Sequence, residues 1–220
     1  ASGIAHEIRN PLNYISLAID HLRSEVVEQC PERAGEVTAL ADKIREEVRR
    51  ANYMVINFMN YGRPLKLRKS EIAYPELLER TLSVLYERLA EQQVTVEQEI
   101  SADLPVLLLD PELMRNCITN FITNAAQAMP NGGTIVLEGE LDDQPGWVRL
   151  SFKDQGCGIA VEDQEKVFQP YFTTKDVGIG LGLAITERIV KAHGGEILVA
   201  SSPGEGTTFS VRLPMEELKG

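Results

Sequence analysis

Residues Asn120–Met129 read NFITNAAQAM and belong to a helix that the pair Asp110-Pro111 opens. Proline suits the first turn of a helix, because the N–H group that it lacks would have no partner there. At 100° per residue, side-chain amides recur along one face of this helix and apolar residues along another. The amides are Asn116, Asn120, Asn124 and Gln127, and the apolar residues are Met114, Phe121, Ile122 and Ala125. The pattern predicts one buried face and one face that presents amides.

This row of amides is unusual, because asparagine has a poor propensity for the interior of a helix. Amide oxygens suit a hard cation such as Mg²⁺ that also binds phosphate oxygens. They add no negative charge that would repel a triphosphate. Solvated helix faces also carry amides, so this helix alone leaves both interpretations open.

Helices and strands alternate on both sides of this helix. Further helices are expected at Tyr74–Gln92 and Gly180–His193. The expected strands are Val94–Ile100, Val106–Leu109, Thr134–Glu140, Trp147–Lys153, Glu196–Ser201 and Thr207–Leu213, and the last two form a hairpin. The interleaving predicts an α/β domain over residues 68–220.

A loop with two glycines, Asp154-Gln-Gly156-Cys-Gly158, directly follows one of these strands. The glycines would let the backbone approach a flat base. The carboxylate of Asp154 could accept a hydrogen bond from the exocyclic amine of adenine. A simple turn explains the same residues, so the loop is weak evidence on its own.

A second glycine-rich segment, Gly178-Ile-Gly180-Leu-Gly182, leads into the last expected helix. Such glycines expose backbone donors where the helix dipole favours phosphate. Lys175 precedes the segment and could reach a terminal phosphate. The spacing matches neither a P-loop nor a dinucleotide-binding fingerprint.

Two long amphipathic helices precede the α/β domain. Apolar residues recur every three or four positions from Ile4 to Val26 and from Val37 to Phe58, with a break at Cys30–Gly35. Two such helices with a short connection form an antiparallel hairpin. Because one hairpin cannot bury both apolar stripes, we expect a homodimer in which two hairpins form a four-helix bundle.

His6 lies roughly opposite the apolar stripe of the first helix, on the same face as Asn10. Pro11 interrupts this helix at a cost of about 3 kcal/mol, which indicates a functional reason for its position. An exposed imidazole could accept a phosphoryl group while Glu7 takes the proton from its other nitrogen. Asn10 could orient a water for the reverse, phosphatase reaction. The plain alternative is a solvated histidine, which this helix alone favours.

The composition excludes some partners. The 220 residues include 22 Lys and Arg and 33 Asp and Glu, which gives a formal net charge of −11. Nucleic-acid binders present a basic face, so no nucleic-acid partner is expected. No apolar run approaches the roughly 20 residues that span a bilayer, so this segment is expected to be cytoplasmic. Because Ala1-Ser2-Gly3 lead straight into a helix, we expect a missing upstream part, which would carry any membrane anchor.

Six motifs, in this order, resemble those of bacterial sensor histidine kinases. They are HEIRNPL (His6–Leu12), NFITNAAQAM (Asn120–Met129), DQGCG (Asp154–Gly158), FQPYFTTK (Phe168–Lys175), GIGLGL (Gly178–Leu183) and GEGTTF (Gly204–Phe209). Each motif alone is weak, but six in sequence are specific and extend over nearly the whole chain. The amide at Gln127, where the family often has a basic residue, is similar to the nitrogen-regulator type of sensor kinase.

The resemblance implies two domains. Residues 1–67 would be a dimerisation and histidine phosphotransfer domain, and residues 68–220 an ATP-binding α/β two-layer sandwich of the Bergerat (GHKL) type. His6 would be phosphorylated from ATP, with Glu7 as the base, and would pass the phosphoryl group to an aspartate of a response regulator receiver domain. Asn10 matches the position linked to dephosphorylation of that partner.

The resemblance also implies a set of nucleotide-binding residues. Asn124 would ligate Mg²⁺ with support from Asn120. The other implied contacts to ATP are Gln127, Asp154, Gly156, Gly158, Lys175, Gly178, Gly180, Gly182, Leu183 and Thr208.

Two other functions compete with this one. Topoisomerases and related ATPases share the nucleotide fold, but there a glutamate one turn before the metal-binding asparagine activates water. Asn120 occupies that position and cannot act as a general base. A non-catalytic dimeric scaffold that binds nucleotide only to change shape is the second competitor, and the presence of all expected catalytic residues disfavours it.

Overall fold

The computed structural model describes residues 2–29, 31–61, 65–174 and 180–215. Side chains are described for these residues, with the exception of 2–10, 31, 49–50 and 52–61. The chain separates into two compact units, Ala1–Pro64 and Leu65–Gly220.

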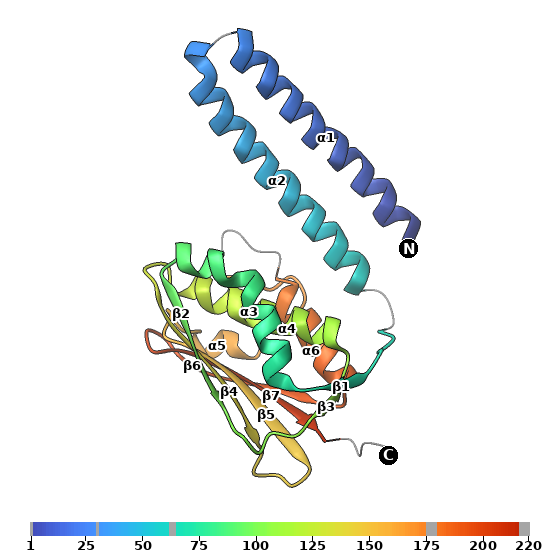
Figure 1. Cartoon of the computed structure of the whole chain (residues 1–220), viewed down its shortest axis with the longest axis vertical. Helices are drawn as coiled ribbons and strands as arrows, with labels where there is room; N and C mark the ends of the chain where they lie inside the picture. Colours follow the sequence, from blue (N-terminus) through green and yellow to red (C-terminus); the bar gives the residue numbers. More distant parts are fainter. Residues whose placement is uncertain (1, 30, 62–64, 175–179, 216–220) are drawn as a thin grey trace. The chain divides into compact units, whose positions relative to one another are not determined.

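The first unit is a helical hairpin (Figure 1). Helix α1 spans Ser2–Gln29, the short 3₁₀ helix η1 spans Pro31–Arg33, and α2 spans Ala34–Tyr61. The predicted hairpin is confirmed, and α1 continues through Pro11. The break between the helices is shorter than predicted, because α2 begins at Ala34 and takes Gly35 into its first turn.

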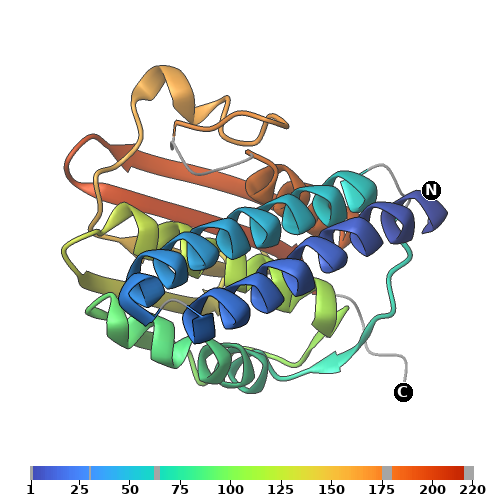
Figure 2. The same cartoon turned by 90° about the horizontal axis from the view of Figure 1, so that it is seen from above.

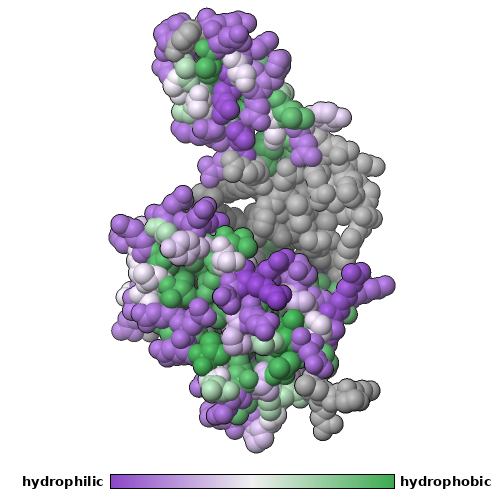
Figure 3. Space-filling model, viewed as in Figure 1, coloured by the Kyte–Doolittle hydropathy of each residue, from purple (hydrophilic) through white to green (hydrophobic). Residues whose placement is uncertain are grey.

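The hairpin buries only part of its apolar surface. Ile19, Ala41 and Val48 are buried between the two helices, and Leu12 packs against them. Four other members of the predicted stripes stay exposed, namely Ile15 at 44%, Leu22 at 57%, Leu40 at 60% and Ile44 at 39%. Apolar side chains accordingly interrupt the polar surface of this unit in Figure 3.

The second unit contains the predicted α/β domain. Its helices are α3 (Tyr74–Glu91), α4 (Pro111–Ala128), α5 (Val161–Gln164) and α6 (Gly182–Ala192). Its strands are β1 (Ser70–Ile72), β2 (Val94–Ile100), β3 (Leu107–Leu109), β4 (Gly133–Leu141), β5 (Trp147–Asp154), β6 (Glu196–Ser202) and β7 (Gly206–Pro214).

Five of these strands form a mixed sheet in the order β2-β4-β5-β7-β6. β2 and β4 are parallel, with Val94 opposite Gly133, and the other three pairs are antiparallel. The parallel pair requires a crossover, which β3 and α4 supply. A separate two-stranded sheet joins β1 to β3.

Helices α3, α4 and α6 lie against one face of the five-stranded sheet, which makes a two-layer sandwich (Figure 1). The core between the layers includes a chain of aromatic rings. Phe121 of α4 stacks on Phe152 of β5 with 4.5 Å between ring centroids, and it lies 5.4 Å from Phe209 of β7. Phe168 meets Phe209 edge to face at 6.2 Å, so the segment before the glycine-rich loop is anchored in the core.

All predicted strands and helices of this unit are confirmed to within two residues at most ends. Two short elements were not predicted, β1 and α5. With three and four residues, neither is long enough to show a period in the sequence. Helix α5 lies beside the edge strand β6 (Figure 2), where the side-chain amide of Gln164 donates to the carbonyl of Ser201 at 2.8 Å.

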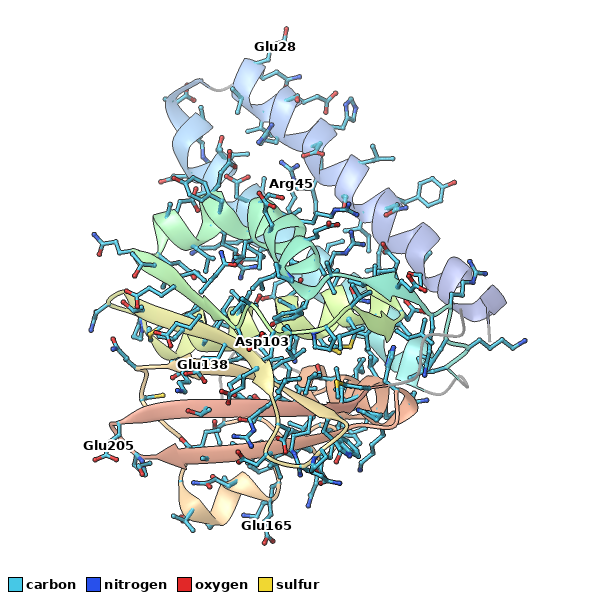
Figure 4. The ribbon with its side chains drawn as sticks, turned by 60° about the horizontal axis from the view of Figure 1, so that its bottom comes forward. Glu28, Arg45, Asp103, Glu138, Glu165 and Glu205 are labelled. Carbon is cyan, nitrogen blue, oxygen red and sulfur yellow. The ribbon has the colours of Figure 1, made fainter. Side chains whose placement is uncertain are left out.

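The labelled acidic residues are scattered over the protein (Figure 4), and of the two described cysteines one is exposed and one is buried. The acidic residues labelled in Figure 4 are spread over both units, with Glu28 in α1, Glu138 in β4, and Asp103, Glu165 and Glu205 in connecting segments. Cys157 is exposed, whereas Cys117 is buried, and burial raises the pKa of its thiol to about 12. Among the described residues, none of the helices combines the length and apolarity that crossing a bilayer requires.

Candidate nucleotide site

Helix α4 carries the amide row, and its first turn is capped as the sequence predicts. The carboxylate of Asp110 accepts a hydrogen bond from the N–H of Leu113 at 3.1 Å. The apolar face of α4 is buried, and Met114, Phe121 and Ile122 are at most 1% exposed. On the amide face, Asn120 and Asn124 are half-buried, whereas Gln127 is exposed.

The amide row meets the N-terminus of α6 at Asn120. The side-chain N–H of Asn120 donates to the hydroxyl of Thr186 at 3.1 Å, and that hydroxyl donates to the carbonyl of Gly182 at 3.0 Å. A Cβ at Gly182 would lie 2.3 Å from Oδ1 of Asn120, so any other residue here would displace the Asn120 side chain. Among the residues that the structure describes, no side chain caps the first turn of α6. Its backbone donors therefore lie beside the amide row.

The loop with Gly156 meets the other end of α4. The N–H of Cys157 donates to the carbonyl of Ala128 at 3.2 Å. A Cβ at Gly156 would lie 2.6 Å from Cβ of Ala128, and one at Gly158 would lie 2.1 Å from the carbonyl oxygen of Ser202. Both glycines are therefore required for the close packing of this loop, whether or not a base lies on it.

Asp154 is held at the start of this loop and is 9% exposed. Its Oδ1 accepts hydrogen bonds from the N–H groups of Gly156 at 2.9 Å and Thr207 at 3.2 Å. Asp154 continues the alternation of the buried residues Val148, Leu150 and Phe152 on β5, which places it on the helix-covered face of the sheet. Two backbone donors thus fix a carboxylate at the end of β5, on the face of the sheet that the helices cover.

The sequence prediction did not include Ser201 and Thr207, which support this carboxylate. Their hydroxyl oxygens lie 3.0 Å apart, and the Ser201 hydroxyl also accepts from the N–H of Ile159 at 2.8 Å. The alternation along β7 could have identified Thr207, because it lies two residues before the apolar Phe209. The same alternation turns Thr208 to the opposite face of the sheet, so the structure does not bring this predicted contact to the others.

The glycine-rich segment is held at Gly180, which has a φ of +66°. Its carbonyl accepts from the N–H of Tyr171 at 2.9 Å, and a Cβ would lie 2.2 Å from the carbonyl oxygen of Phe172. Leu183, in the first turn of α6, packs its side chain against the core, so only its backbone can contact a phosphate. Lys175 and Gly178 lie outside the described residues, as do the side chains of His6, Glu7 and Asn10.

The three parts of the site are spaced along α4. From Asn120 to Ala128 the helix rises by roughly 12 Å. The loop Asp154–Gly158, called the adenine loop below, lies at one end of this distance and the N-terminus of α6 at the other, with Asn124 between them. The arrangement can bind a purine at one end, phosphates at the other and a hard cation in the middle.

A different pocket, of about 800 Å³, lies on the opposite face of the sheet. Its polar wall is an ion-pair cluster, in which Asp142 accepts from Arg212 at 2.8 Å and from Arg149 at 2.9 Å. The Arg212 guanidinium holds the pKa of the Asp142 carboxyl well below its usual range. Because these charges neutralise one another, the cluster is structural, and none of the predicted nucleotide residues lines this pocket.

Two family models match the chain. Residues 1–64 match the His Kinase A (phospho-acceptor) domain, and residues 109–217 match the histidine kinase-, DNA gyrase B-, and HSP90-like ATPase. The second match contains α4, the adenine loop Asp154–Gly158 and the N-terminus of α6.

Relatives and solved structures agree with these matches. The signal transduction histidine-protein kinase AtoS of Escherichia coli (strain K12) is 33% identical over 216 residues, which are 97% of this chain and 34% of AtoS. The structure of full-length ShkA in complex with AMPPNP has a TM-score of 0.80 and 26% identity, and it covers 100% of this chain and 46% of ShkA. The complex of histidine kinase ThkA with response regulator protein TrrA has a TM-score of 0.68 and 25% identity, and it covers 98% of this chain and 60% of ThkA.

The chain spans less than half the length of the first curated relatives that it matches. Within that span, the two family models, the relatives and the hairpin-plus-sandwich architecture agree. The chain therefore belongs to the two-component sensor histidine kinases and corresponds to their catalytic core.

Proposed function

We propose that this chain phosphorylates His6 from ATP and transfers the phosphoryl group to an aspartate of a response regulator. Residues 1–67 act as the phosphotransfer and dimerisation domain, and residues 68–220 as the catalytic domain. The observation that carries the proposal is the contact of the amide row on α4 with the N-terminus of α6, through Asn120, Thr186 and Gly182. Titration with ATP, followed by transfer of label from its terminal phosphate to the protein, tests it.

The residues of the site fit ATP. Asp154, fixed by the N–H groups of Gly156 and Thr207, accepts from the exocyclic amine of adenine. The backbone donors of the first turn of α6 bind phosphate oxygens, which the helix dipole favours. AMPPNP, an ATP analogue, is bound in the structure of ShkA, which supports the same ligand here.

Mg²⁺ fits the amide row by the chemistry of its donors. Asn124 offers an amide oxygen on the face between the adenine end and the phosphate end, and such oxygens are suitable ligands for a hard cation. The cation, when bound, neutralises charge on the phosphates during transfer. Asn120 holds α6 in place through Thr186, so it supports this site by position.

In the reaction, an imidazole nitrogen of His6 forms a bond to the terminal phosphorus of ATP, and the bond to the bridging oxygen of ADP breaks. Glu7 accepts the proton from the other ring nitrogen, which keeps the attacking nitrogen nucleophilic. The phosphoryl group then passes to the carboxylate of the partner. Asn10, one turn after His6, orients a water if the chain also removes that phosphoryl group.

The partner is a response regulator receiver domain, as in the complex of ThkA with TrrA. Two large apolar side chains on α1, Tyr14 at 72% and Leu17 at 65% exposure, lie on the face opposite Ile19 at 100° per residue. This face also carries position 6. Its exposed apolar area supports docking of a partner beside His6.

A purely hydrolytic function is disfavoured by the environment of Asn120. Hydrolysis needs a general base near the terminal phosphate, and an amide cannot accept a proton. The side chain of Asn120 instead donates to Thr186.

Changing Asn124 to Asp is expected to raise the Kd for ATP in the presence of Mg²⁺ by about tenfold or more, because a carboxylate next to the triphosphate adds repulsion. The measurement is a titration with ATP at saturating Mg²⁺, paired with the rate of autophosphorylation. Asn116→Asp makes the same change on an exposed position of the same helix, two turns earlier, and should leave the Kd within about twofold. Equal Kd values and equal rates for Asn124→Asp and the unmodified chain would remove Asn124 from the site.

Homodimerisation through the hairpin explains its exposed apolar residues. At 100° per residue, Ile15 and Leu22 point about 40–60° to one side of the buried Ile19. On α2, Leu40 and Ile44 are rotated about 60–100° from the buried Ala41, in the same sense about the helix axis as on α1. Because the two helices are antiparallel, these rotations bring all four side chains to the same face of the hairpin. A second hairpin on this face would complete a four-helix bundle.

Changing Leu40 to Glu should weaken the dimer about 100-fold, because the change occurs once in each protomer and each copy costs at least about 1.4 kcal/mol. Sedimentation over a range of protein concentrations measures the dissociation constant. Val84→Glu places the same charge on an exposed apolar position of the second unit and should leave the constant unchanged. A dimer that tolerates Leu40→Glu would have its interface elsewhere.

A further inference from the structure

His193 is a buried histidine at the C-terminal end of α6, and the proposed reaction does not use it. The residue is only 3% exposed. It follows the last residue of α6, and its backbone N–H donates to the carbonyls of Ile189 at 3.2 Å and Val190 at 3.0 Å. Burial of a polar ring requires hydrogen-bond partners, which here are Ile189 on α6 and Asp110, the N-cap of α4.

Each ring nitrogen of His193 has a defined partner. Nδ1 lies 2.8 Å from the carbonyl oxygen of Ile189, and Nε2 lies 3.0 Å from the backbone N–H of Asp110. A carbonyl can only accept and an N–H can only donate. Both bonds therefore form with the neutral ring that carries its proton on Nδ1. The ring closes the end of α6 and at the same time accepts from the residue that caps α4.

Asp110 is shared by three parts of the second unit. Its Oδ1 accepts from Leu113 in the first turn of α4, and its Oδ2 accepts from the backbone N–H of Arg68 at 2.8 Å. Its own N–H is the donor to His193, and the residue is 5% exposed. A change at His193 therefore acts directly on the start of the helix that carries the amide row.

Helices α4 and α6 are thus joined at two places. One joint is His193 with Asp110, at the C-terminal end of α6. The other is Thr186 with Asn120, one turn after the N-terminus of α6. With 11 residues, α6 is about 16 Å long, so two joints fix both its axial position and its tilt on α4.

We propose that His193 is a positioning residue for the triphosphate end of the nucleotide site, acting through Asp110 and the placement of α6 on α4. This inference rests on the proposed function. It concerns the phosphate end alone, because Asp154, Ser201 and Thr207 at the adenine end are held by hydrogen bonds of their own. Loss of the joint at His193 lets the N-terminus of α6 and the amide of Asn124 move apart, while the adenine end keeps its shape.

The test compares the affinities of the whole 220-residue chain for ATP, with Mg²⁺, and for adenosine, measured by competition against a fluorescent nucleotide. His193→Phe keeps a ring but removes both hydrogen bonds, and it should raise the Kd for ATP about tenfold. The Kd for adenosine should stay within about twofold, because adenosine makes no phosphate contacts. His193→Gln places a side-chain acceptor near the position of Nε2 and should restore the Kd for ATP to within about threefold.

A matched control separates positioning from general loss of stability. Val94→Ala removes buried apolar volume on β2, at the far edge of the sheet from β6, so it lowers the melting temperature without touching either joint. It should leave both Kd values unchanged.

An unchanged Kd for ATP in His193→Phe would overturn the positioning role. So would a parallel rise of the Kd values for ATP and adenosine in that variant, since a loosened fold affects both ligands. If the unmodified chain binds no ATP, the proposed function itself fails, and this result is obtained before any variant is compared.

Discussion

Replacing His6 by Gln is expected to abolish the transfer of label from the terminal phosphate of ATP to the protein. Glutamine keeps the helix and a polar side chain of similar length, but it has no nucleophilic ring nitrogen. Because the proposed nucleotide site lies entirely in the second unit, the Kd for ATP should stay the same in this variant. The measurement is incorporation of radiolabel that is labile in acid and stable in base, the behaviour of a phosphohistidine.

His21 provides the matched control on the same helix. Its side chain is 74% exposed, and its ring nitrogen lies 3.7 Å from the carboxylate of Glu25. His21→Gln removes an exposed histidine from α1 roughly four turns away from position 6, so full labelling should remain. Label that persists in His6→Gln but disappears in His21→Gln would identify His21 as the phosphoryl acceptor. Label that persists in both variants would place the phosphoryl group on another residue.

Replacing Asp154 by Asn is expected to raise the Kd for ATP at least about 100-fold while the fold is kept. The amide oxygen of Asn can still accept from the N–H groups of Gly156 and Thr207, which now bond to Oδ1. Its NH₂ group, however, replaces a carboxylate oxygen that would accept from the adenine amine. Two donors then face each other, and a hydrogen bond to a charged acceptor, worth about 1.5–3 kcal/mol, is lost.

The fold and the chemistry of this variant can be measured separately. Thermal unfolding reports whether the loop retains its hydrogen bonds, and equilibrium titration with ATP reports the base contact. Asp143→Asn, at a side chain that is 97% exposed in the loop after β4, makes the same chemical change away from the site and should alter neither quantity. An Asp154→Asn protein that binds ATP as tightly as the unmodified chain would show that another group recognises the base.

Most of the fold could be predicted because its signals are local. The period of the apolar residues in α1 and α2, the Asp110 cap of α4 and the alternation along β7 are each contained in a few consecutive residues. The short elements β1 and α5 lack such a period. The exposed members of the hairpin stripe show a different limit, because a periodic pattern marks which residues are suited to burial but not which partner covers them.

Prediction of the site was limited in the same way. The glycines and the amides were recognised from their spacing, but the partners of these residues were not. The resemblance implies a contact at Thr208, whereas it is the N–H of the neighbouring Thr207 that donates to Asp154. The sequence predicts His193 as the end of a helix but contains no signal for its bond to Asp110.

The sequence by itself determined the order of the helices and strands, the residue types available for phosphoryl transfer and the family of the chain. These follow from spacing along the backbone, which the sequence contains directly. Only the tertiary structure decided three hydrogen bonds. The side chain of Asn120 donates to Thr186, the N–H of Thr207 donates to Asp154 from 53 residues away, and the N–H of Asp110 donates to His193 across 83 residues. Such bonds depend on strand register and helix packing to within an ångström, because a hydrogen bond forms only over a narrow range of distance and angle.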